Sequence, residues 1–196
     1  MKKNVIIAGV PRAGKSTLSR IIAKNFGYQH VSMDAINAAF ERVFPELGIN
    51  TYADMSSLEI LYNISSKISP FIAAMIDSDS NEYYEFGRGM VIDVYQLLPD
   101  DYAKYLAKKN CEIFYLITSN VTPEERFVIQ RKYDTEKDYT FSYSDEEIRE
   151  GCEYIVEQSK LMKEQCQKHG LPYYETAKNR KTVFEQFVQM FAQKNL

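Results

Sequence analysis

The sequence predicts an α/β protein in which a parallel sheet is covered on both faces by helices. Short apolar runs typical of strands alternate with segments whose apolar residues recur at helical spacing. A glycine-rich turn directly follows the first of these runs and opens the first helical pattern. Since no repeat, low-complexity tract or Gly/Ser-rich linker divides the 196 residues, we expect a single domain over residues 1–196.

Five short runs are the candidate strands of this sheet. Runs of this length, rich in apolar and β-branched residues, are typical of strands buried in a parallel sheet. Strands separated by helices form βαβ units, which place helices on both faces of the sheet in a three-layer sandwich. The runs are Asn4–Ala8, Tyr28–Ser32, Met90–Asp93, Glu112–Ile117 and Leu171–Glu175.

The helices between these runs have readable ends. Gly27 follows an apolar stripe and is well placed to end the first helix, and Gly170 occupies the same position after the longest helical pattern. Three sites carry Ser or Thr with Glu three residues later, which is the spacing of a capping box and predicts a helix start. These sites begin at Thr122, Ser144 and Thr182.

The composition excludes several classes of protein. Apolar residues make up 45% of the chain and aromatic residues 13%, which is enough for a core and argues against disorder. With 24 basic and 27 acidic residues the net charge is −3, so the chain lacks the bulk charge of a general nucleic-acid binder. Two histidines are too few for a histidine-rich metal site.

The cysteines and the N-terminal residues indicate where the protein is found. Three cysteines without CxxC spacing form no disulfide framework, and we expect Cys152 and Cys166, on a helical apolar stripe, to be core residues. The apolar run Val5–Val10 is too short for a signal peptide, and no run approaches a membrane span. We therefore expect a soluble, cytoplasmic protein without a membrane or nucleic-acid partner. No pattern indicates its oligomeric state.

The segment Gly9–Ser16 matches the Walker A pattern G-x-x-x-x-G-K-[ST]. Its glycines let the backbone approach phosphate oxygens, and the following helix presents free N–H groups to the anion. Lys15 is placed to bridge the β- and γ-phosphates, and Ser16 to bind Mg²⁺. A merely structural glycine turn is the alternative, but a strand precedes the motif and an amphipathic helix follows it. The expected nucleotide contacts are Gly9, Pro11, Arg12, Ala13, Gly14, Lys15, Ser16 and Thr17.

Two aspartates follow candidate strands and are candidates for the chemistry. Asp93 ends the third run, where an acid can hold Mg²⁺ through water; the alternative is a carboxylate that caps the next turn. Asp34 follows the second run, at the sheet edge where ligands bind. There it can accept the proton of a substrate hydroxyl that attacks the γ-phosphate, or it can simply be the N-cap of the helix that continues through Phe40.

Four arginines are candidates for contacts with anions. Arg126 and Arg131 can stabilise the charge that spreads over the transferred phosphoryl group. They are five residues apart, so on one continuous helix they diverge by about 140°. Arg126 is the better candidate, and Arg131 fits a solvated face equally well. Arg42 and Arg88 flank a long segment and can hold an anionic acceptor, although surface positions are the usual place for arginine.

Two segments exceed what a minimal sheet needs. Residues Asp34–Gly87 contain a short helix ending near Pro45 and a longer apolar-periodic stretch that Pro70 is expected to interrupt. We expect this segment to bind the acceptor, with ordinary helical cover of the sheet as the alternative. Residues Arg126–Ser144 are polar and predict a lid or a plain surface loop. The aromatic residues of the first segment either stack on a base or fill its core: Tyr52, Tyr62, Tyr83, Tyr84 and Phe86.

The turn after the fifth run is a weaker candidate for nucleotide contact. It lies at the same edge of the predicted sheet as the Walker A motif. The backbone of Thr176 and Ala177 is therefore expected to border the adenine ring.

Together these residues resemble the P-loop kinases of the nucleoside and nucleotide kinase superfamily, such as adenylate, shikimate and gluconate kinases, polynucleotide kinase and the zeta-toxin group. The resemblance spans nearly the whole chain as architecture, while only the Walker A motif is highly specific. It implies a five-stranded parallel sheet in the order 2-3-1-4-5, an acceptor-binding region in 34–87 and a lid in 126–144. Adenylate kinases carry Asp-Gly-Phe-Pro-Arg after the third strand, whereas this chain has Asp93-Val94-Tyr95-Gln96-Leu97.

Three functions fit these observations. The preferred one is a kinase that transfers the γ-phosphate of MgATP to a hydroxyl of a small molecule, with Asp34 as base. ATP is favoured because no Asn-Lys-x-Asp guanine motif occurs. A nucleoside-monophosphate kinase, which needs no base, is the second. An ATP-binding regulatory protein with little transfer activity is the third.

Overall fold

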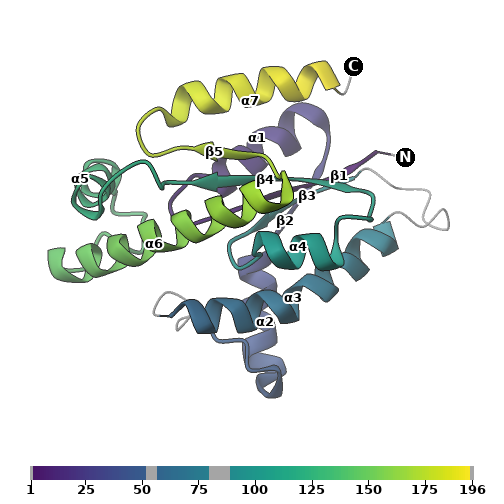
Figure 1. Ribbon diagram of the computed structural model, residues 1–196, viewed down its shortest axis with the longest axis horizontal. Helices are drawn as coiled ribbons and strands as arrows, with labels where there is room; N and C mark the ends of the chain where they lie inside the picture. The colour runs from purple at the N-terminus through teal and green to yellow at the C-terminus, as the bar shows by residue number, and fades with distance from the viewer. Residues whose placement is uncertain (1, 52–56, 80–88, 195–196) are drawn as a thin grey trace.

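The computed structural model describes residues 2–51, 57–79 and 89–194. Its centre is a sheet of five parallel strands in the order β2-β3-β1-β4-β5, which confirms the predicted order (Figure 1). The five predicted runs correspond to these strands with small differences at their ends. The strands are β1 (Asn4–Gly9), β2 (Gln29–Ser32), β3 (Met90–Val94), β4 (Cys111–Ile117) and β5 (Tyr173–Glu175).

Burial differs between the central and the edge strands. All residues of β1 and β3 are buried, whereas β2 and β5 at the two edges are partly exposed. A parallel strand in the middle of a sheet has helices on both faces, so both sets of its side chains enter the core. This explains why the central strands are continuous apolar runs in the sequence.

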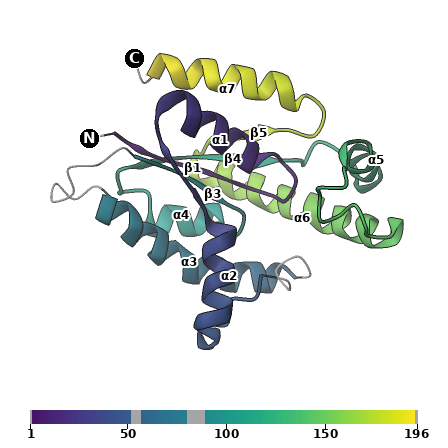
Figure 2. The same cartoon turned by 180° about the vertical axis from the view of Figure 1, so that it is seen from behind.

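Helices cover both faces, as the predicted three-layer sandwich requires. In Figure 1, α1 (Lys15–Phe26) and α7 (Arg180–Lys194) lie above the sheet, and α3 (Leu58–Asp79) and α4 (Pro99–Tyr105) lie below it. Helix α6 (Asp145–His169) packs against α4. Seen from behind, α2 (Met33–Val43) projects downward from the end of β2 (Figure 2). A short 3₁₀ turn, η1 (Pro45–Leu47), follows α2, and α5 (Pro123–Tyr133) packs against α6.

Most helix ends follow from local chemistry. Thr122 and Ser144 form complete capping boxes at the starts of α5 and α6, and Gly27 and Gly170 adopt the left-handed conformation that ends α1 and α6. The capping box predicted at Thr182 is wrong, because α7 already begins at Arg180 and Thr182 lies inside its first turn. The spacing alone does not identify a cap when the chain has turned into a helix earlier.

The expected interruption at Pro70 is also wrong, because α3 runs unbroken through this residue. A proline inside a helix removes one hydrogen bond and crowds the preceding turn. The helix nevertheless buries a continuous apolar face, and this packing outweighs the local penalty. The fully buried residues of that face are Leu61, Ile64, Ile68, Ile72 and Ile76.

Cys152 and Cys166 are core residues, as predicted, and Cys111 is buried as well. Cys152 and Cys166 are fully buried, and Cys111 lies in β4 at 4% exposure. All three are free thiols. Among the described residues, no helix combines the length and the apolar character needed to cross a membrane.

Two glycines provide a matched test of the backbone. Gly9 has φ +129°, and a Cβ there would lie 2.0 Å from the Leu116 carbonyl oxygen, whereas a Cβ on Gly151 in α6 would meet nothing within 4 Å. Gly9→Ala should lower the free energy of unfolding by about 3 kcal/mol. Gly151→Ala should raise it by about 0.5–1 kcal/mol. Urea unfolding of both variants checks this, and equal effects would contradict it.

Candidate functional site

The Walker A segment forms a loop between the central strand and the first helix. Val10 N–H donates to the Leu116 carbonyl at 3.1 Å, which attaches the loop to the end of β4. Gly14 has φ +98°, and a Cβ there would lie 2.7 Å from the Phe184 ring of α7. Helix α1 begins at Lys15, as predicted, and its N-cap Gly14 has no side chain to occupy the first N–H groups. No cap side chain therefore competes with an anion at the start of α1.

Lys15 folds back over this loop. Its side chain is buried, and Nζ donates to the Val10 carbonyl at 3.0 Å. Nζ also lies 5.6 Å from the centre of the Tyr95 ring, within range of a cation–π contact. The ammonium group is thus placed inside the curve of the loop, close to the residues that follow β3.

Two aspartates lie near the carboxyl ends of the neighbouring strands β2 and β3. Asp34 lies in the first turn of α2, while Ser32 occupies the N-cap, so the interpretation of Asp34 as the cap is wrong. Solvent reaches the Asp34 carboxylate, yet surrounding protein partly desolvates it, and this raises its pKa. The charge of Lys15 lowers that pKa and the charge of Asp93 raises it. The three side chains therefore share one electrostatic environment.

Asp93 lies inside β3 opposite Ser32 of β2, rather than in the turn that follows. It is 2% exposed, and within the described parts of the chain its Oδ2 has no hydrogen-bond partner. The imidazole of His30 in β2 lies close by, with its Nε2 3.9 Å from Oδ2. A buried carboxylate oxygen without a hydrogen bond is unfavourable unless a cation or its water approaches it.

Arg126 of α5 reaches the other side of the loop. It is 1% exposed, and its Nη2 lies 3.4 Å from the Pro11 carbonyl. Burial lowers its pKa to about 10, and the charges of Arg180 and Arg12 act in the same direction. Because α5 is continuous through Arg131, that second arginine faces away and instead pairs with Asp145 at 2.7 Å.

Arg12 connects the loop to the predicted lid. It is the only described non-glycine residue with positive φ, at 60°. Its guanidinium donates to the carboxylates of Asp134 and Asp138. The Thr140 hydroxyl also donates to Asp134, at 2.9 Å. The predicted lid region therefore consists of most of α5 followed by residues 134–144, which these contacts hold against the Walker A loop.

A cavity of about 850 Å³ opens beside the loop, between α1, α5 and α7. Ala177, one of the two residues expected to border the adenine ring, lines this cavity. Thr176 does not, because its N–H and hydroxyl both face the Ile117 carbonyl, at 2.9 and 3.4 Å. The remaining wall combines apolar and polar side chains, among them Thr17, Ile21, Ile129, Tyr133, Lys178, Arg180 and Val188.

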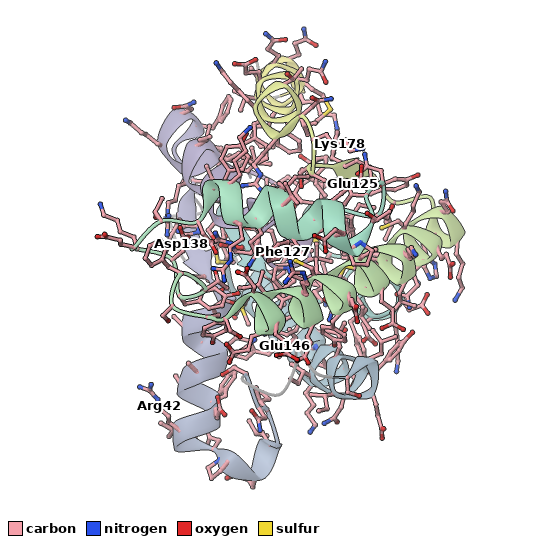
Figure 3. All side chains as sticks on the ribbon, turned by 90° about the vertical axis from the view of Figure 1, so that its left-hand side faces the viewer. Arg42, Glu125, Phe127, Asp138, Glu146 and Lys178 are labelled. Atoms are coloured by element: carbon pink, nitrogen blue, oxygen red, sulfur yellow. The ribbon has the colours of Figure 1, made fainter. Side chains whose placement is uncertain are left out.

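Some other residues that were predicted to contact a ligand do not line this cavity. Arg42 is exposed and projects outward from α2, well apart from Asp138 (Figure 3). Tyr62 is 42% exposed, and its hydroxyl accepts a hydrogen bond from Gln165 of α6, so it does not fill the core. Several predicted residues lie outside the described residues: Arg88, Tyr52, Tyr83, Tyr84 and Phe86.

The sequence analysis missed two residues of the site. Tyr95, two positions after Asp93, lies against Lys15, and Arg180 at the start of α7 contacts the Walker A loop. Both follow strands at the same edge of the sheet as the motif, and this position was the available signal. A tyrosine or an arginine at these positions does not by itself indicate a role, and only the contacts with Lys15 and the Walker A loop do.

The lid contact has a testable pH dependence. Hydrogen bonds from Arg12 and Thr135 hold the pKa of Asp138 below its ordinary value of 3.8. A carboxylate with a depressed folded-state pKa stabilises the fold above its unfolded pKa, and this contribution is lost as the pH falls. Asp138→Asn should therefore lower the melting temperature near neutral pH, and the difference should shrink below about pH 4. Thermal unfolding across this range checks it, with the exposed Glu136→Gln in the same segment as control; a constant difference would contradict it.

Comparison with known proteins identifies the fold and not the family. No protein-family model matches the sequence, and no curated protein matches it. The structure resembles the shikimate kinase of Acinetobacter baumannii in complex with shikimate, with a TM-score of 0.57, 14% identity and coverage of 100% of this chain and 96% of that chain.

Two further solved structures have a similar fold. The shikimate kinase of Bacteroides thetaiotaomicron has a TM-score of 0.54 and 15% identity, and covers 97% of each chain. A sugar kinase of Janibacter sp. HTCC2649 has a TM-score of 0.54 and 14% identity, with 96% of this chain and 94% of that chain covered. At these identities the likeness shows the architecture alone. That architecture is an α/β fold like that of shikimate kinase.

Proposed function

We propose that this protein is a kinase that transfers the γ-phosphate of MgATP to a hydroxyl group of a small molecule. The observation that carries the proposal is the convergence of Lys15, Asp34 and Asp93 at the carboxyl ends of β1, β2 and β3. One cation and two carboxylates beside a Walker A loop supply the groups that phosphoryl transfer to a hydroxyl needs. The fold shared with shikimate and sugar kinases supports a small-molecule acceptor.

The donor nucleotide fits the space beside the loop. A cavity of 850 Å³ accommodates a nucleoside, and its walls combine apolar side chains from α1 and α7 with polar groups. The open amides at the start of α1, with Lys15 and Arg126, would bind the phosphates. We retain ATP as the donor because the chain has no guanine-binding motif.

The residues present also fit Mg²⁺. The Oδ2 of Asp93 is a buried carboxylate oxygen that has no hydrogen-bond partner among the described residues. The Ser16 hydroxyl follows Lys15 at the start of α1. Oxygen ligands of this kind suit Mg²⁺, which commonly keeps several of its waters. When bound, Mg²⁺ would neutralise charge on the phosphates.

Asp34 is the proposed base. As the acceptor oxygen bonds to the γ-phosphorus and the bond from phosphorus to the β-phosphate oxygen breaks, the hydroxyl proton passes to the Asp34 carboxylate. A raised pKa makes this carboxylate a better proton acceptor than an ordinary aspartate. It also remains open to solvent, so an acceptor can reach it.

Replacement of Asp34 tests the base. Asp34→Asn should lower kcat for a hydroxyl acceptor by roughly 100-fold or more, because the amide cannot take the proton. Binding of MgATP should change little. Steady-state kinetics and calorimetry measure the two effects, with the exposed Asp77→Asn as control. Near-normal turnover with the true acceptor would show that Asp34 is not the base, as expected if the acceptor is a phosphate.

Replacement of Lys15 tests the phosphate site. Lys15→Ala should weaken MgATP binding by roughly 10- to 100-fold, because a buried cation that reaches the phosphates is lost. Calorimetric titration with MgATP measures it, and Lys104→Ala, at an exposed position in α4, is the control. Unchanged affinity would remove Lys15 from the site.

A screen of acceptors tests the reaction itself. We expect nucleosides, sugars, hydroxy acids or aminoglycosides to include a compound that stimulates ADP release at fixed MgATP. Stimulation by nucleoside monophosphates alone would favour the monophosphate-kinase alternative. ATP binding without stimulation by any class would favour a regulatory protein.

A further inference from the structure

Arg180 occupies the boundary between the cavity and the Walker A loop. Its Nη2 donates to the Arg12 carbonyl at 2.6 Å. Its Cδ and Nε lie 3.2 and 3.4 Å from the place where a Cβ on Gly14 would be. The same side chain lines the 850 Å³ cavity. Arg180 therefore contacts the loop where α1 begins and borders the space proposed for the nucleoside.

The guanidinium group of Arg180 has no counter-ion within the described residues. Arg180 forms no ion pair there, and its Nε is buried without a hydrogen-bond partner. Arg126 resembles it in both respects, whereas Arg12 pairs with Asp134 and Asp138. Burial and the nearby charge of Arg12 lower the pKa of Arg180. Two partly desolvated guanidinium groups without counter-ions thus face the same loop.

A purely structural role explains only part of this arrangement. Arginine has five N–H donors, and the bond to the Arg12 carbonyl uses one of them. Holding a partly buried guanidinium beside two like charges is unfavourable unless an anion joins them. A phosphate group provides several acceptor oxygens and the negative charge, and arginine binds it in a bidentate manner.

We propose that Arg180 binds the phosphate adjoining the nucleoside of the donor nucleotide, so that α7 forms part of the donor site. This inference rests on the proposed function and adds to it a residue from the far end of the chain. The place of Arg180 at the cavity selects the phosphate nearest the nucleoside, while Lys15 lies further inside the loop. Arg180 then acts on binding of the donor more than on the transfer step.

The binding experiment compares ligands with and without phosphate. Calorimetry is performed on the full chain and on Arg180→Ala and Arg180→Lys, with ATP, AMP, adenosine and tripolyphosphate. Arg180→Ala should weaken ATP, AMP and tripolyphosphate by roughly 10- to 100-fold and leave adenosine unchanged. Arg180→Lys should restore part of the loss, since it keeps the charge. Arg149→Ala, an exposed arginine paired with Glu124, is the matched control and should bind as the parent does.

The outcomes separate this inference from the proposed function. Unchanged affinity of Arg180→Ala for ATP would overturn the inference, as would an equal loss for adenosine, which would indicate a change in cavity shape. A loss for ATP with AMP unchanged would contradict the position beside the nucleoside. If the parent binds ATP but transfers phosphate to no acceptor, the proposed kinase activity fails while the binding data still decide the role of Arg180. A parent that binds neither ATP nor tripolyphosphate would overturn both.

Discussion

The site depends on how closely the last residue of the central strand approaches its neighbour. Gly9 lies against the backbone of Leu116, leaving no space for a side chain, and Val10 then donates to the same carbonyl. This contact fixes where the loop leaves the sheet and therefore where α1 begins. A second close approach, between Gly14 and Phe184 of α7, fixes the other end of the loop. Because both glycines adopt positive φ, the backbone can turn tightly between the end of β1 and the start of α1.

Around this loop the fold places acidic and basic side chains on different sides. The carboxylates Asp34 and Asp93 lie on the side of β2 and β3, and the arginines Arg12, Arg126 and Arg180 arrive from the loop, α5 and α7. Like charges held close together and partly desolvated oppose folding, so the packing of the sheet and helices has to offset them. Sites that bind charged ligands commonly carry such local conflict, and the ligand relieves it. Within the described residues, Arg12 is the only one of these three arginines that forms ion pairs, and its partners are Asp134 and Asp138.

Much of the fold was predictable because its signals are local. Buried parallel strands are short apolar runs, and the starts of α5 and α6 are set by capping boxes whose two side chains lie three residues apart. The errors occur where distant packing outweighs a local signal. Pro70 does not break α3, since the buried isoleucines of that helix belong to the hydrophobic core. Thr182 does not begin α7, because the chain has already entered the helix at Arg180.

By itself, the sequence determined the alternation of strands and helices, the position of the Walker A loop and the aspartates that follow β2 and lie in β3. These depend on neighbouring residues and on the rule that parallel strands end at one edge of a sheet. Only the tertiary structure placed Arg126 rather than Arg131 at the Walker A loop, paired Arg12 with Asp134 and Asp138, and brought Arg180 to Gly14. These contacts join residues more than 100 positions apart, apart from the choice between the two arginines, which the direction of α5 decides. No local pattern encodes them, because they arise when separate helices pack on the two faces of one sheet.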